Sequence, residues 1–107
     1  MIPATIQDVS CFIKETYQFG PEQIETMLKS FRESLKQEFI NAETGLAQNN
    51  STVVWRAAHT IKGALLNGGV TEWAEFARKI ELSAKNGEEK DYKQLFNELK
   101  NGVSGIL

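Results

Sequence analysis

Residues 51–69 read STVVWRAAHTIKGALLNGG, and this stretch has the apolar spacing of a helix that is buried along one side. At about 100° per residue, one narrow apolar stripe lies roughly 200 to 260° away from His59. The stripe consists of Val54, Ala58, Ile61 and Leu65. Either Asn50 or Ser51 can cap the start of this helix, and Gly68-Gly69 ends it after Asn67. The stretch therefore predicts an amphipathic helix with His59 near its centre, on the side away from the core.

The rest of the chain has the same helical period and nowhere the alternating pattern of a β-strand. Turn-forming residues divide it into further predicted helices, which run from about Thr5 to Tyr17, from Pro21 to Leu46, from about Thr71 to Asn86, and onward from Lys90 or Asp91. Gly102 and Gly105 predict a loose tail. Long amphipathic helices with short connections pack against antiparallel neighbours. We therefore expect an all-α protein, an up-and-down antiparallel four-helix bundle with an additional short N-terminal helix, with residues 1–107 as a single domain.

Composition narrows the classes of partner. The 107 residues carry 12 Lys plus Arg against 14 Asp plus Glu, and this net charge of -2 gives no general attraction to nucleic acid or anionic lipid. No apolar run reaches the roughly 18 residues that span a bilayer, and the first residues do not resemble an export signal. We expect a cytoplasmic protein that binds neither nucleic acid nor membrane. Cys11, the only cysteine, has apolar neighbours and is expected to be a buried, inert thiol.

The side of the helix that carries His59 has an unusual set of neighbours. These are Thr52, Trp55, Arg56, Lys62, Gly63 and Leu66, all within about 60° of the histidine. Helical side chains lean toward the N-terminus, so Lys62 can reach back to the imidazole. Gly63 leaves its place beside the ring empty, although glycine in a helix costs about 1 kcal/mol relative to alanine. An open imidazole beside a cation is suited to receive an anionic group.

Simpler explanations exist for each of these residues. His59 could be an idle surface histidine, and Gly63 could serve close helix packing, although it projects from the histidine's side. Trp55 and Leu66 could pack against the first helix or form the apolar rim of a docking surface, and both alternatives stay open. The aromatic residues Phe31, Phe39, Phe76 and Phe96 follow core spacing. No metal site is expected, because one histidine and one cysteine on different helices cannot form a closed site.

Three sequence features together resemble histidine-containing phosphotransfer (HPt) domains. They are Arg56 to Gly63 (RAAHTIKG), then Asn67 and Gly69, and then Ala77 to Glu81 (ARKIE). The resemblance implies that His59 is phosphorylated, that Lys62 lies near the phosphoryl oxygens and that Gly63 leaves room. It gives Gly69 and Asn67 structural or secondary roles. The chain departs from the family pattern at Leu65, where a small or hydroxyl residue is common, and at Gly68, where an apolar residue is usual.

The implied function is a phosphorelay shuttle without kinase activity of its own. His59 would accept a phosphoryl group from the aspartyl phosphate of a receiver domain and pass it to another receiver. The chain has no phosphate-binding loop of the G-x-x-x-x-G-K-[ST] type and no evident carboxylate cluster near His59, so no cofactor is expected and Mg²⁺ would belong to the receiver. The expected partners are response-regulator receiver domains or a hybrid sensor histidine kinase, docked on Trp55, Arg56, Leu66 and Asn67 of a monomer. The alternative is a helical adaptor that docks a signalling partner and is never phosphorylated.

Overall fold

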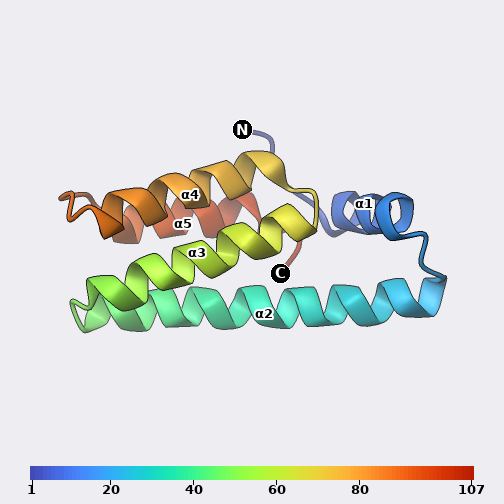
Figure 1. Ribbon diagram of the computed structural model, residues 1–107, viewed down its shortest axis with the longest axis horizontal. Helices are drawn as coiled ribbons and strands as arrows, with labels where there is room; N and C mark the ends of the chain where they lie inside the picture. The colour runs from blue at the N-terminus through green and yellow to red at the C-terminus, as the bar shows by residue number, and fades with distance from the viewer.

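The computed structural model describes all 107 residues and contains five α-helices and no strand. The helices are α1 (Ile6–Tyr17), α2 (Pro21–Ala47), α3 (Ser51–Asn67), α4 (Thr71–Lys85) and α5 (Tyr92–Gly102). Figure 1 shows α2 to α5 lying along one common direction, with each helix running opposite to the one before it. The all-α prediction is confirmed. No helix is both long enough and apolar enough to cross a membrane.

Local capping chemistry sets the helix starts. The Thr5 hydroxyl accepts a hydrogen bond from the backbone of Asp8, and the Asp8 carboxylate accepts one from the backbone of Thr5, which forms a capping box at α1. At α3 the Asn50 side chain accepts from the backbone N–H of Val53 at 3.3 Å, so Asn50 and not Ser51 is the cap. Asp91 caps α5 in the same way. The predicted boundaries therefore agree with the structure to within a few residues.

A single apolar cluster lies between the helices. It contains 21 buried residues, drawn from all five helices and from both chain ends. The predicted stripe of α3 is buried in it, and α3 packs most extensively on α2 and α4. Phe39 and Phe96 are buried as well, whereas Phe31 and Phe76 are partly buried against the cluster. Because the stripe of α3 faces inward, the opposite side of α3 faces solvent.

The C-terminal tail is ordered, so the prediction of a loose tail is wrong. Val103 and Ile106 are fully buried. The backbone N–H of Ala4 donates to the carbonyl of Gly102 at 2.8 Å, which ties the two chain ends together. A side chain at Gly102 would overlap the indole ring of Trp73. Gly102 thus permits a close approach of helices and does not mark fraying, because Val103 and Ile106 continue the apolar stripe of α5 beyond it.

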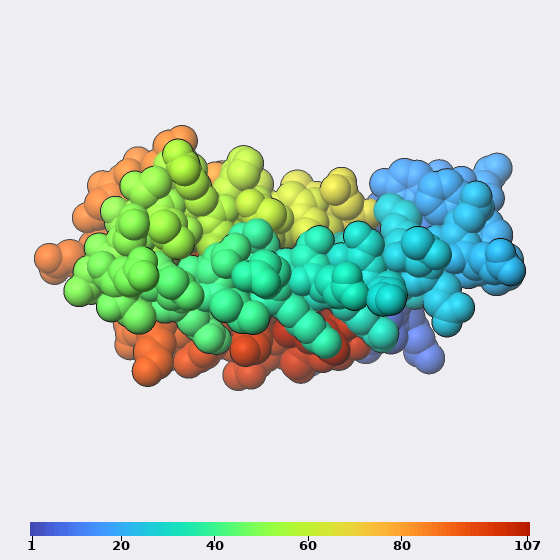
Figure 2. Space-filling view, turned by 90° about the horizontal axis from the view of Figure 1, so that it is seen from below, coloured from blue at the N-terminus to red at the C-terminus, as the bar shows by residue number.

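Helix α1 lies outside the main group of helices. α2 has 27 residues against 17 in α3, so it extends beyond the end of α3, and α1 packs beside this extension (Figures 1 and 2). Val9 and Ile13 form the buried side of α1. Cys11 lies between them in sequence and is exposed, so the prediction of a buried thiol is wrong. Its apolar sequence neighbours point to other sides of the helix.

Candidate functional site

His59 is exposed on the solvent side of α3 and faces α4. Its side chain keeps 60% of its surface accessible. The ring atom Nδ1 lies 2.6 Å from Oε2 of Glu81, within hydrogen-bonding distance. An ionised carboxylate can only accept, so Nδ1 carries the proton and donates it, and Nε2 holds the lone pair. Nε2 has no hydrogen-bond partner in the chain, which leaves a nucleophilic nitrogen on an accessible ring.

Glu81 on α4 is the buried centre of the site. Its side chain is only 8% exposed, and its two oxygens bind different partners. Oε2 accepts from His59, and Oε1 accepts from Nζ of Lys62 at 2.9 Å. Burial raises the pKa of the Glu81 carboxyl, but the hydrogen bonds from Lys62 and His59 and the positive charge of Lys62 outweigh burial, and the pKa lies below its usual value. Glu81 is therefore a carboxylate at neutral pH.

Lys62 reaches back toward the histidine, as the lean of helical side chains predicts. Its Nζ lies 3.4 Å from Nδ1 of His59. Both nitrogens point protons at Glu81, so the approach is a contact between two donors and not a hydrogen bond between them. The Lys62 side chain is 22% exposed, and its ammonium group lies on the Nδ1 side of the ring. Lys62 is therefore held by Glu81, beside the imidazole.

The space next to Gly63 is empty. A side-chain carbon built at Gly63 would meet no atom within 4 Å, apart from the backbone of its own helix. The alternative of close helix packing at Gly63 is therefore wrong. Gly63 stands one turn after His59, so nothing in the chain covers the imidazole from this direction.

The predicted docking residues are spread along the same side of α3. Arg56 and Asn67 are exposed, and Leu66 keeps 49% of its surface accessible. Trp55 is partly buried, and Nζ of Lys85 on α4 lies 5.0 Å from its ring centroid, a cation–π distance. Since Lys85 ends α4, whereas α1 lies beyond the opposite end of α3, Trp55 packs toward α4 and not against α1 (Figure 1).

The two glycines after α3 act in packing. Gly69 has φ of +77°, a conformation that glycine adopts without strain, and the ring of Phe12 fills the place where a side chain would be. Gly68 is buried, and the ring of Phe31 occupies the space of the missing side chain. Leu65 is fully buried. The departures at Leu65 and Gly68 thus belong to the core and lie away from the imidazole.

Sequence reasoning did not assign a role to Glu81, although a signal for one was present. The buried stripe of α4 includes Trp73, Ala77, Ile80 and Ala84. Glu81 stands four residues after Ala77 and three before Ala84, so it falls on this stripe. A carboxylate is rarely buried without a partner. Its position on an apolar stripe therefore indicates a cationic or hydrogen-bonding partner on a neighbouring helix.

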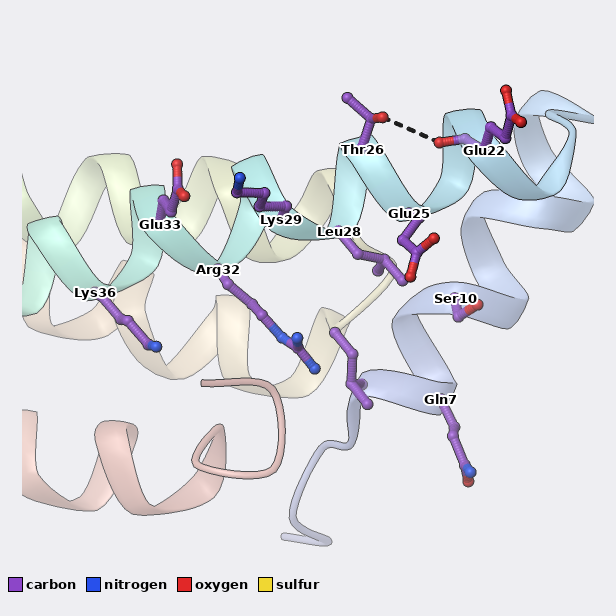
Figure 3. Close-up of a pocket in the computed structure, with 11 residues that line it drawn as sticks. Gln7, Ser10, Glu22, Glu25, Thr26, Leu28, Lys29, Arg32, Glu33 and Lys36 are labelled. Carbon is purple, nitrogen blue, oxygen red and sulfur yellow. Dashed lines mark hydrogen bonds between the residues drawn. The ribbon is translucent and has the colours of Figure 1, made fainter.

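A wide cleft of the molecule is separate from this site. It has a volume of about 900 Å³ and lies between α1 and α2 (Figure 3). Its cations are Lys29, Arg32 and Lys36, and no residue of α3 or α4 lines it. No group of three or more histidine, cysteine, aspartate or glutamate side chains is placed to hold a metal ion.

The chain matches a known family model. The family model described as Hpt domain matches residues 26–107, which is more than half of the chain and includes all of α3, α4 and α5. Helix α1 lies outside the matched residues. No curated protein and no solved structure matches the chain significantly.

Proposed function

The chain belongs to the Hpt domain family, as the residues around His59 predict, and we propose that His59 accepts a phosphoryl group from the aspartyl phosphate of a receiver domain and passes it to another receiver. Membership implies histidine phosphotransfer in two-component signalling, carried out by a phosphocarrier module and not by an enzyme. We propose that residues 1–107 act as one domain, in which α2 to α5 form an antiparallel four-helix bundle and α1 is an addition.

One observation carries the proposal: Nε2 of His59 presents a lone pair on an accessible ring. Phosphoryl transfer through a loose, in-line transition state requires mainly a positioned nucleophile and charge stabilisation. Glu81 fixes both the orientation of the ring and the position of its proton. The bond from phosphorus to the receiver's aspartate oxygen breaks as the bond from Nε2 forms, and the ring gains a positive charge that faces the Glu81 carboxylate.

Lys62 and Gly63 have supporting roles in this proposal. The Lys62 ammonium is close enough to shift from Glu81 toward phosphoryl oxygens, because a flexible four-carbon stem carries it. Gly63 leaves the approach to the ring open. Trp55, Arg56, Leu66 and Asn67 would surround the docked receiver, with Asn67 in a secondary role and Gly69 in a structural one.

The proposed partners would supply the metal ion and the acidic groups for the transfer. Transfer from an aspartyl phosphate needs a metal ion and acidic groups, and we assign both to the receiver, with Mg²⁺ as the ion. Receiver domains of response regulators and of hybrid sensor histidine kinases fit this role. We further propose that the chain works as a monomer in the cytoplasm, without nucleic acid or membrane as a partner.

Transfer from a phosphorylated receiver tests the proposal. Wild-type protein should acquire an acid-labile, base-stable label, and His59→Gln should acquire none. The glutamine variant is a matched control because its amide can still donate to Glu81, and circular dichroism should show unchanged helicity. An unlabelled wild type that still binds the receiver as tightly as His59→Gln does would instead support the adaptor.

A further inference from the structure

We propose, on the basis of the function above, that Glu81 keeps the proton on Nδ1 after His59 has been phosphorylated, so that the phosphoryl group leaves a neutral imidazole during onward transfer. Glu81 is thus a positioning residue with a second role. It orients the ring before phosphorylation and holds the phosphorylated ring in its reactive, protonated form afterwards.

The chemistry of the phosphorylated ring creates the need for such a group. Attack by Nε2 gives a ring with phosphorus on Nε2 and a proton on Nδ1, which is an imidazolium cation. Imidazolium groups exchange their protons in the physiological pH range. If the Nδ1 proton is lost, the later transfer has to expel an imidazolate anion. If it is kept, the Nε2–phosphorus bond breaks, its electron pair returns to Nε2, the phosphoryl group passes to the receiver's carboxylate oxygen, and a neutral imidazole remains.

The Glu81 carboxylate lies directly beside Nδ1, the ring atom whose proton is to be kept. Oε2 of Glu81 lies 2.6 Å from Nδ1. The Glu81 side chain is 8% exposed, so solvent screens the attraction of its carboxylate for the ring proton less than at the surface. Its ionised form is already stabilised by Lys62 through the other oxygen. Proton release from Nδ1 would leave the Nδ1 lone pair facing this carboxylate, which is unfavourable.

The other charged groups near the ring do not reverse this effect. Lys62, from α3, opposes a positive ring, but its ammonium binds Oε1 of Glu81 before phosphorylation and would turn to the phosphoryl oxygens afterwards. Arg78, on α4, is bound to Glu75 by two hydrogen bonds. Lys85 lies over the ring of Trp55. Glu81 is the one anion that contacts His59, so removal of its charge isolates the proposed effect.

Glu81→Gln is the appropriate variant, because glutamine has nearly the same shape and no charge. Its amide can accept from a protonated Nδ1 or donate to an unprotonated one, so it does not favour either state. Wild type and variant would be phosphorylated with phosphoramidate, a small donor that needs no docking surface. The half-life of phosphohistidine would then be measured by ³¹P NMR from pH 5 to pH 9, together with the rate of transfer to a receiver.

The phosphohistidine of both proteins should be labile at low pH and stable at high pH. Since an anion within about 4 to 6 Å shifts a titration by about 1 to 3 pH units, the midpoint of the lability profile should lie that far lower in Glu81→Gln. At a pH between the two midpoints the variant should keep its phosphoryl group longer and transfer it more slowly. Lys62→Met should move the midpoint in the opposite direction.

Coincident profiles for wild type and Glu81→Gln would overturn the inference, whereas His59 would remain the acceptor. Failure of the proposed function has a different signature, since neither protein would then exchange phosphate with a receiver at any pH. A folding defect is detected independently by circular dichroism and by the thermal midpoint. A folded variant with a shifted lability profile cannot be explained by a merely structural role of Glu81.

Discussion

Replacement of Gly63 by leucine should stabilise helix α3 and block phosphoryl transfer at the same time. Glycine in a helix interior costs about 0.8 to 1.0 kcal/mol relative to alanine, and leucine is nearly as good a helix former as alanine. A first side-chain carbon at Gly63 meets no atom within 4 Å, so the Cβ atom itself causes no clash. For a domain of about this size, 1 kcal/mol corresponds to a rise in Tm of about 4 to 8 °C.

The same leucine should lean back over the turn that carries His59, because helical side chains point toward the N-terminus. A displacement of about 1 Å in a reacting pair can cost 100-fold in rate, so we expect transfer to fall by about that factor. Gly63→Ala is the matched control, since a methyl group gives the same stabilisation without reaching the ring. The assay combines thermal unfolding with rapid-quench transfer from a phosphorylated receiver. A Gly63→Leu protein that transfers at the wild-type rate would refute the steric reasoning.

Three further predictions concern the side of α3 that carries His59, the buried carboxylate of Glu81 and the C-terminal tail. Trp55→Ala and Leu66→Ala should each slow transfer while circular dichroism stays nearly unchanged; a large loss of helicity would place that residue in the core instead. The folded pKa of Glu81 lies below its unfolded value of 4.5, so its contribution to stability should be full above that value and lost as pH falls through the folded pKa. Urea unfolding between pH 3 and pH 7 should show this loss in wild type and a smaller one in Glu81→Gln. Ile106→Ala should cost about 2 to 5 kcal/mol in denaturant unfolding, whereas a loose tail would predict less than about 0.5 kcal/mol.

Most of the helical framework could be predicted from the sequence, because the signals involved are local. The apolar stripe of α3, its cap at Asn50 and its end before Gly68 depend on residues a few positions apart. The exposed position of His59 follows from the same stripe. These features depend on helix periodicity and on the capping residues at the helix ends, and not on contacts between residues far apart in the sequence.

The features that could not be predicted depend on distant contacts. The tail is ordered because Gly102 meets Ala4, nearly the whole chain away in sequence. The contact between Glu81 and His59 joins α4 to α3, and periodicity alone does not tell which residue of α4 lies opposite His59. Cys11 is exposed although its sequence neighbours are apolar, because successive residues of a helix point to different sides. Apolar sequence neighbours are therefore a weak sign of burial in a helix whose buried apolar stripe is narrow.

The most direct test of the central claim is to identify the phosphorylated atom in the intact protein. Protein labelled with ¹⁵N at histidine, once phosphorylated by a receiver, should show coupling between phosphorus and Nε2 of His59 and a proton on Nδ1. Coupling to Nδ1, or a phosphoryl group on any other residue, would contradict the assignment of Nε2 as the free nucleophile and of Glu81 as the group that directs it.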